Sequence, residues 1–377
     1  LSSSDFIYAH RYENNKSLLT ITTEERLEDN ATYSFVFKDK IYGEDDIYFE
    51  GYAVRLWMTA DSVPPVLSEV EVYSNNDSGN TEIAKVGDVV TFRFTSIEDV
   101  LKPAVKINDN PIDKSKINYN SGLDQNILET QYTLSPSDPD GFLSYEIKEL
   151  VDFSDNPSVL DLQRGAGELE MNFFEVNDGV TPILEINGQE ASGSLNGESY
   201  NVSFEIDDSN SSIIYEITNN ALVWNNLDDG KFLGSGLISG AVRFDNNPPE
   251  IKEITLISTN PGENKNDYPQ EENKHARLLK DNDTLTLVFT TSEQIRIQPS
   301  VEFSSVQGIF NATRIENIVF GTTWDSETTW KAELDIKDHM VALSNHEGFI
   351  GFKITVLDLA GNERVVEFQD DGNALVQ

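Results

Sequence analysis

Clusters of aspartate and asparagine are the side chains of this sequence best suited to chemistry. They lie in short polar segments that the flanking residues predict to be turns or linkers. The candidate ligands are Asp61; Asp152, Asp155 and Asn156; Asp245 and Asn247; and Asp358 and Asn362. Calcium binds six to eight oxygen atoms from carboxylates, amide carbonyls and the backbone. The clusters are therefore candidate structural calcium sites.

A second interpretation of the same residues needs no metal. Asp and Asn are common in turns because their side chains bond to nearby backbone and tolerate left-handed conformations. The segment Asp281-Asn282-Asp283 lacks the glycine and the final glutamate of an EF-hand loop. Calcium is thus expected at one or more of the clusters, not at every one.

Catalytic chemistry finds little support in the sequence. There is no cysteine, no Gly-x-Ser-x-Gly elbow and no glycine-rich phosphate loop. The four histidines lie in different predicted domains or in polar loops and form no His-Glu-x-x-His motif: His10, His275, His339 and His346. Four tryptophans could stack on sugars but are expected to pack in cores or interfaces, as aromatic residues usually do: Trp57, Trp224, Trp324 and Trp330. We predict that the chain is not an enzyme.

Charge excludes two classes of partner. The 377 residues carry 27 basic and 66 acidic side chains, a formal net charge of −39. Such a chain repels phosphate backbones and anionic lipid, so neither nucleic-acid binding nor membrane insertion is expected. No run of about 18 apolar residues occurs either.

The segments that must position the clusters form an internal repeat. One copy starts at Val63-Pro64-Pro65 and the other at Asn247-Pro248-Pro249, each followed by an apolar segment. Further matched blocks follow in the same order: 87–95 with 282–290, 103–105 with 299–301, and 140–147 with 347–354. The prolines favour stiff, extended junctions. We therefore predict a short β domain at 1–62, an immunoglobulin-like β-sandwich at 63–180, a short immunoglobulin-like β domain at 181–247, and an immunoglobulin-like β-sandwich at 248–377 with a polar insertion near 261–282.

Apolar residues alternate with polar ones within the repeats. Val90, Phe92 and Phe94 alternate with polar neighbours, and so do Leu285 and Leu287. This period of two is typical of strands with one buried face, and turn residues separate the strands. The fold class predicted is all-β, with tandem immunoglobulin-like antiparallel β-sandwiches arranged as an extended rod.

The repeats resemble the immunoglobulin-like (Big-type) repeats of large bacterial cell-surface adhesins. The resemblance rests on the linker Asn247-Pro248-Pro249, the strand at 87–95 and the closing turn at 358–362, which reads Asp-Leu-Ala-Gly-Asn. The first copy departs at that turn, where it reads Asp-Phe-Ser-Asp-Asn at 152–156. The resemblance implies calcium bound at inter-domain junctions, where it stiffens the rod.

Three functions fit these observations. The first is a non-catalytic stalk of an extracellular cell-surface adhesin or surface filament. The expected partners are neighbouring immunoglobulin-like domains of the same or identical chains, and a cell-surface glycan or protein. The alternatives are a self-assembling surface-layer or sheath subunit and an accessory region of a secreted enzyme.

Overall fold

A computed structural model describes most of the sequence that follows residue 63. Described are residues 64–120, 125–165, 167–174, 183–206, 212–218, 235–259, 282–305, 308–319, 323–336 and 350–368, and the backbone of seven further strands. Six of these strands pair two by two: β1 (Phe6–Glu13) with β2 (Lys16–Thr23), β3 (Thr32–Phe35) with β6 (Leu56–Thr59), and β4 (Ile41–Tyr42) with β5 (Tyr48–Phe49). No α-helix is found in the described part. The insertion predicted near 261–282 lies outside it, except for Asn282.

The C-terminal part of the protein forms a two-sheet sandwich, here called the second sandwich. One sheet has the order β25-β26-β30-β29 and the other β28-β27-β31-β32-β33. The strands are β25 (Ile251–Ser258), β26 (Thr284–Thr291), β27 (Ser300–Ser305), β28 (Gly308–Asn311), β29 (Arg314–Val319), β30 (Thr328–Asp335), β31 (Gly351–Leu357), β32 (Glu363–Phe368) and β33 (Ala374–Val376). Lettered in sequence order, the sheets read A-B-E-D and C′-C-F-G, with β33 as an additional strand beside G, which is the immunoglobulin arrangement.

Alternating burial along the strands builds the core of this sandwich. The strand β26 alternates half-buried with buried positions throughout. Its Leu285, Leu287 and Phe289 pack with Phe303 and Ile354 of the facing sheet. The predicted period of two and the all-β, immunoglobulin-like fold class are confirmed here.

The described residues between 64 and 244 form a larger body with the same arrangement at its centre, here called the first body. Its sheets have the orders β12-β13-β9-β7-β23-β22-β18-β19 and β11-β10-β15-β16-β17-β21-β20. The strands up to β17 are β7 (Leu67–Ser74), β8 (Ile83–Ala84), β9 (Val89–Ser96), β10 (Ala104–Ile107), β11 (Asn110–Pro111), β12 (Asn118–Tyr119), β13 (Ile127–Thr133), β14 (Gly141–Phe142), β15 (Tyr145–Lys148), β16 (Leu160–Gly165) and β17 (Glu168–Phe173); a 3-10 helix is Lys114–Lys116. The remaining strands are β18 (Ile183–Ile186), β19 (Gln189–Ala191), β20 (Gly193–Asn196), β21 (Ser199–Glu205), β22 (Ser212–Thr218), β23 (Ser235–Ser239) and β24 (Arg243–Phe244).

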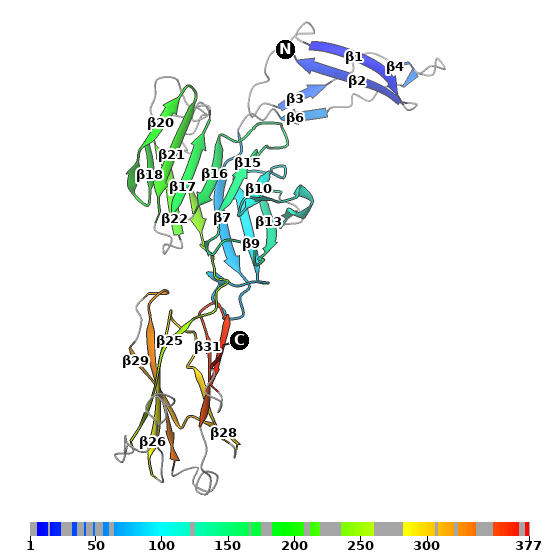
Figure 1. Cartoon of the computed structure of the whole chain (residues 1–377). Coiled ribbons are helices and arrows are strands. Elements are labelled where there is room, and N and C mark those ends of the chain that lie inside the picture. The colour runs from blue at the N-terminus through cyan, green and yellow to red at the C-terminus, as the bar shows by residue number, and fades with distance from the viewer. Residues whose placement is uncertain are drawn as a thin grey trace.

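Strands β18–β24 extend the first body instead of forming a domain of their own. The strand β23 pairs in parallel with β7, and β21 pairs with β17, so both sheets continue across the predicted boundary. One core cluster contains residues from Val66 to Phe244. The Tyr215 hydroxyl donates a buried hydrogen bond of 2.6 Å to the Leu67 carbonyl. The structure thus differs from the division predicted at residue 180, because the apolar face of 183–244 is buried against the sheets that precede it (Figure 1).

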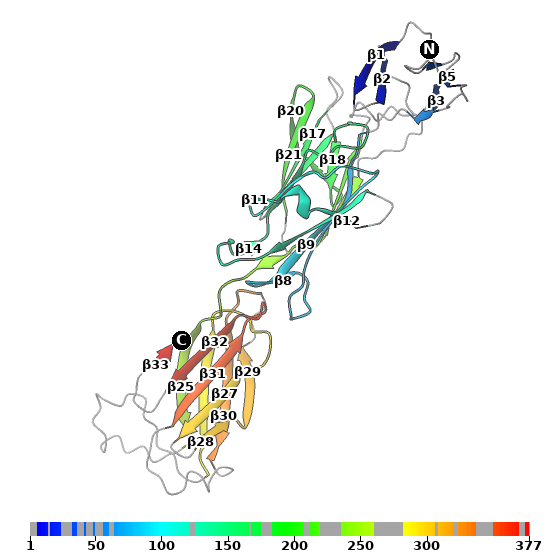
Figure 2. The ribbon, with the colours of Figure 1, turned by 90° about the vertical axis from the view of Figure 1, so that its right-hand side faces the viewer.

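A short linker leaves the first body and enters the second sandwich. The strand β24 pairs with both β14 and β8 in a small three-stranded sheet at one end of the first body. The backbone then passes through Pro248 and Pro249 into β25. Figure 2 shows β8, β14 and β24 at the end of the first body that faces the second sandwich. Residues 245–249 therefore lie at a junction between two separate cores.

Candidate metal centre

Three carboxylates from three different segments meet at the junction. Asp245 lies on the linker after β24, Glu293 in the loop after β26, and Asp358 in the turn between β31 and β32. One carboxylate oxygen of each lies within 4.8 Å of those of the other two. Asp358 is fully buried, and the other two are half-buried. We call these three residues the junction cluster.

The turn that carries Asp358 is held by its own hydrogen bonds. The Asp358 Oδ1 accepts from the backbone N–H groups of Gly361 (2.6 Å) and Asn362 (2.8 Å), and Oδ2 accepts from Asn362 Nδ2 (2.8 Å). Gly361 has a φ of +92°, which favours glycine. A carboxylate oxygen has two lone pairs, so these bonds leave capacity for a cation.

The first body contains the same turn despite its different sequence. The Asp152 Oδ1 accepts from the N–H groups of Ser154 and Asn156, and Oδ2 accepts from Asn156 Nδ2 at 2.7 Å. Asp155 has a φ of +66° and takes the position that Gly361 occupies in the other copy. The turns also form equivalent isolated bridges, Val100–Asp152 and Ile295–Asp358. Despite the departure noted in the sequence, the two turns differ in only one donor to the aspartate, the N–H of Ser154 in the first copy and that of Gly361 in the second. The hydrogen bonds of Asp152 and Asn156 hold this turn together, so these two residues fit the second interpretation of the clusters, in which no metal is needed.

Asparagine side chains near the cluster connect segments to one another. Asn362 Nδ2 donates both to Asp358 and to the backbone oxygen of Asp245, the latter at 2.9 Å. It therefore joins the linker to the closing turn. The Asn247 side chain instead donates to Asp140 in the first body, whereas its backbone N–H donates to Asp245 Oδ1 at 3.0 Å. Of the predicted junction ligands, Asp245 and Asp358 thus come together directly, and Asn362 bridges them.

Burial and mutual repulsion perturb the acidity of the cluster. Burial, followed by the charges of Asp245 and Asp358, raises the pKa of Glu293 to about 7. Burial also raises the pKa of Asp358 to about 6, although the hydrogen bonds from Asn362 oppose the shift. Burial raises the pKa of Asp245 as well. The charge of Arg243 opposes the shifts at Glu293 and Asp245, but the pKa values of both carboxyl groups remain raised.

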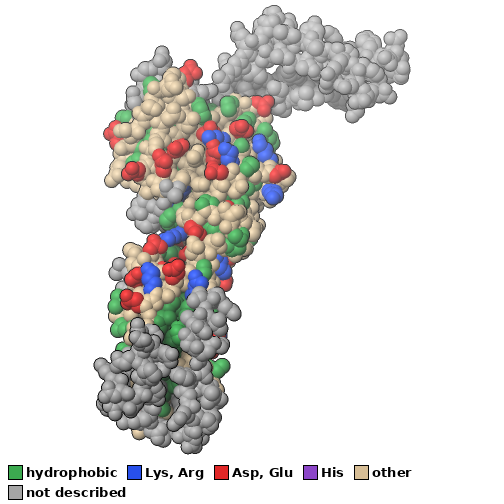
Figure 3. Space-filling model, viewed as in Figure 1, with side chains coloured by type: hydrophobic (Ala, Val, Ile, Leu, Met, Phe, Trp, Pro, Cys, Tyr) green, Lys and Arg blue, Asp and Glu red, His purple; other side chains and the backbone are tan. Residues whose placement is uncertain are grey.

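Other contacts join the two bodies around the cluster. Asn76 Nδ2 donates to the Ala360 carbonyl at 3.0 Å, and Arg296 pairs with Asp77 at 3.0 Å. Arg243 pairs with Asp325 at 2.8 Å, and its guanidinium lies over the ring of Trp324. In Figure 3, basic and acidic side chains lie beside one another where the bodies meet. Trp324 therefore packs at an interface.

Glu293 was missed by sequence reasoning, although a signal for it exists. It follows the strand at 284–291 at the position where Glu98 follows the strand at 89–96. Asp61 and Asp245 likewise precede Pro64 and Pro248 by three residues. Both copies thus carry an acid at each cluster position, and the three acids of the first copy are Asp61, Glu98 and Asp152. Asp61 lies outside the described residues.

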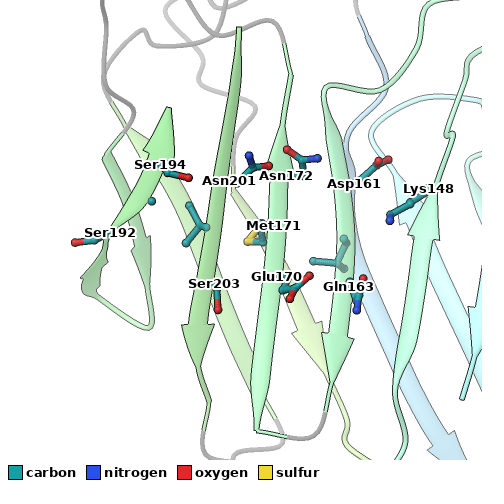
Figure 4. A pocket seen from close by; sticks show the side chains of 13 residues that line it. Lys148, Asp161, Gln163, Glu170, Met171, Asn172, Ser192, Ser194, Asn201 and Ser203 are labelled. Carbon is teal, nitrogen blue, oxygen red and sulfur yellow. The ribbon is translucent and has the colours of Figure 1, made fainter. Parts of the chain in front are cut away.

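A polar groove lies on the first body. It has a volume of about 530 Å³ and crosses β15, β16, β17, β21 and β20 (Figure 4). Its lining includes Lys148, Asp161, Gln163, Glu170, Asn172, Ser192, Ser194, Asn201 and Ser203. The lining contains no aromatic ring, so it offers hydrogen bonds but no stacking platform for a sugar.

Comparison with protein-family models and with curated protein sequences finds no match. Among solved structures, a crystal structure of bovine butyrophilin aligns with 80% of this chain and 98% of its own, at 9% identity and a TM-score of 0.25. The immunoglobulin-like assignment therefore rests on the strand order described above. No helix able to span a membrane is found in the described residues.

Proposed function

We propose that this chain is a non-catalytic structural segment of an extracellular surface protein, a stalk in which immunoglobulin-like sandwiches follow one another as an extended rod. Support comes from the end-to-end arrangement of the two cores and from the contacts that fasten the junction between them. Neighbouring domains of the same or identical chains are then its principal partners.

The junction cluster carries this proposal. Two unit charges 4 Å apart repel by about 1 kcal/mol in water and by about 4 kcal/mol at an effective dielectric of 20. Asp245, Glu293 and Asp358 therefore strain the junction unless protons or a cation neutralise them. Calcium prefers carboxylate oxygens and fills its remaining positions with backbone oxygens and water. We propose that calcium bound to these three residues locks the linker to the second sandwich.

Melting and small-angle scattering of the whole chain test this function. Because the ion binds the folded junction, the melting temperature of the second sandwich should rise with calcium concentration relative to excess chelator. A compact protein of 377 residues would have a radius of gyration of about 21 Å. The stalk should give a clearly larger value, and calcium should narrow the distribution of its dimensions.

Matched variants separate the cluster from general charge effects. Glu293→Gln should abolish the response to calcium. Glu253→Gln removes the same charge from an exposed position of β25 and should leave the response intact. Identical profiles in calcium and chelator would overturn the metal proposal, and a compact radius of gyration would overturn the stalk.

A glycan partner is a secondary proposal, and the groove of Figure 4 is the place to test it. Its Asp161, Asn172 and Asn201 side chains offer the hydrogen bonds that sugar hydroxyls use. Glycan-array binding that is lost in Asn172→Ala would support it. Equal glycan binding by the wild type and by Asn172→Ala would show that the groove is not the glycan site.

A further inference from the structure

Polar side chains of the groove form a row that runs across the strands. The register places Asp161 opposite Asn172, Asn172 opposite Asn201, and Asn201 opposite Ser194. Lys148 continues this line beyond Asp161 on β15 (Figure 4). We call these five residues the first row. It crosses β15, β16, β17, β21 and β20, so hydrogen-bonding groups follow one another at the spacing of the strands.

A second row lies beside the first on the same face of the sheet. It contains Gln163, Glu170 and Ser203, which the register also places opposite one another. On each strand the two rows are two residues apart, and the residue between them points to the other face. These intervening residues are in the core, as Leu162 and Met171 show. The alternation that builds the core therefore also aligns the two polar rows.

The length of the first row fits a short stretch of polymer. Neighbouring strands lie about 4.8 Å apart, so four spacings between five strands give about 19 Å. A sugar ring in an extended, unbranched polysaccharide is close to one such spacing in length. The volume of about 530 Å³ is that of several sugar rings rather than one. At the end of the row, Gly193 lets β20 lie close to β21, because a Cβ there would be 2.5 Å from the Asn201 carbonyl oxygen.

The chemistry of the groove selects against negative charge. Asp161 and Glu170 each place a carboxylate in it, whereas Lys148 already pairs with Glu146 beside it. A ligand that carries carboxylates would meet repulsion from these groups. The described lining residues include no aromatic ring, so a sugar gains hydrogen bonds but no stacking. In the centre of the row, Asn172 Oδ1 is buried and has no hydrogen-bond partner among the described residues. Rotation of this amide would present the oxygen to a ligand hydroxyl.

We propose that the groove binds an extended, unbranched and uncharged polysaccharide that lies across the strands along the first row, with about one sugar ring for each strand spacing. This inference rests on the glycan binding proposed above and specifies the class and orientation of the glycan. Each hydrogen bond contributes little on its own when water competes for it. Affinity must therefore come from the number of rings that contact the row at once, and a single sugar should bind only weakly.

Calorimetric titration of the 377-residue chain with oligosaccharides of defined length tests this. The probes are the di-, tetra- and hexasaccharides of cellulose, mannan and chitin. For one or more of these series, the dissociation constant should fall at least about tenfold from di- to tetrasaccharide. It should fall less than about threefold from tetra- to hexasaccharide, because about four rings fill the row. The same hexasaccharide oxidised to a uronic acid at every ring should bind at least about tenfold more weakly.

Two asparagines of the β20–β21 hairpin provide a matched pair of variants. Asn201→Ala removes a side chain from the first row and should weaken tetrasaccharide binding at least about tenfold. Asn196→Ala removes an exposed side chain at the end of β20, outside the groove, and should leave binding unchanged. The melting temperatures of both variants are compared with that of the wild type, so that a loss of binding is not mistaken for a loss of folding.

The outcomes separate this inference from the functions on which it rests. Binding that is lost in Asn201→Ala but does not depend on oligosaccharide length would leave the glycan site standing and overturn the orientation along the row. Equal or tighter binding of the oxidised hexasaccharide would overturn the preference for an uncharged glycan. If none of the oligosaccharides binds, both the glycan site and this inference are wrong, whereas the stalk function is still decided by scattering.

Discussion

The first body and the second sandwich contain the same immunoglobulin arrangement, but they differ at their edges and at their closing turns. In the first body, strands β18–β23 extend both sheets and bury β7. In the second sandwich, β25 remains half-exposed. The turns at Asp152 and Asp358 share the two hydrogen bonds donated by Asn156 and by Asn362, respectively. Yet among the described residues only Asp358 gathers two further carboxylates. The two copies of one arrangement thus differ in how their edge strands are covered, which the neighbouring segments decide.

The largest expected effect breaks the extension of the first body. Ile238→Asp places a carboxylate in a core position that is fully buried. It should destabilise the first body by about 3–5 kcal/mol, because an unpaired charge is buried and packing is lost. Calorimetry of the 377-residue chain should show one transition shifted to lower temperature and the transition of the second sandwich unchanged.

Ile257→Asp is the matched control for that experiment. Ile257 lies on the exposed edge strand β25 and is 48% exposed. Its replacement should change stability by less than about 1 kcal/mol. Equal losses of unfolding free energy for Ile238→Asp and Ile257→Asp would show that the difference in edge burial between the two bodies does not affect stability.

A second prediction compares the two closing turns. Asp152→Asn and Asp358→Asn each weaken a carboxylate that accepts three hydrogen bonds, at a cost of about 1–2 kcal/mol. In chelator, Asp358→Asn should cost less, because it also relieves repulsion within the junction cluster. In calcium it should cost more, because a ligand is lost. Urea denaturation in calcium and in chelator measures the loss of stability of each variant. If the variant with the larger loss is the same in both conditions, Asp358 serves only the turn and does not bind calcium.

The third prediction concerns pH. The pKa of Glu293 is raised from 4.5 to about 7 in the folded protein. Between these values the folded state binds more protons than the unfolded state, so this contribution to stability is present at low pH and lost as pH rises toward 7. In chelator, the wild type should lose stability relative to Glu293→Gln between about pH 5 and pH 7.5. Parallel pH profiles of the two proteins would show that Glu293 is not perturbed by its neighbours.

The smallest effect is expected from the exposed ion pairs at the junction. Asp77 is 69% exposed and pairs with Lys85 and Arg296. Asp77→Asn should cost less than about 1 kcal/mol, because surface pairs are screened by water and salt. Melting in low and high salt measures it. If Asp77→Asn loses as much stability as Glu293→Gln does in calcium, the ion pairs of Asp77 stabilise the junction as much as the junction cluster does.

Sequence reasoning succeeded where the determining contacts are local. Alternation at Val90, Phe92 and Phe94 predicted a strand, since successive side chains point to opposite faces of a sheet. Matched blocks predicted two copies of one sandwich, and the structure gives them the same strand register. The spacing of Asp358 and Asn362 predicted a turn, because a side chain four residues away can close it.

Long-range contacts are what the sequence did not determine. The hydrogen bond of Ser239 to Val70 joins residues 169 positions apart, and no periodicity encodes which edge a strand will join. A short module cannot bury its apolar face alone, so 183–244 folds onto the sheets before it rather than standing between two sandwiches. Glu293 likewise reaches Asp245 and Asp358 only because the linker, a loop and a turn converge at one junction. The local pattern therefore determined the strands, the repeat and the turns, whereas the tertiary structure alone decided which edges are covered and which acids meet.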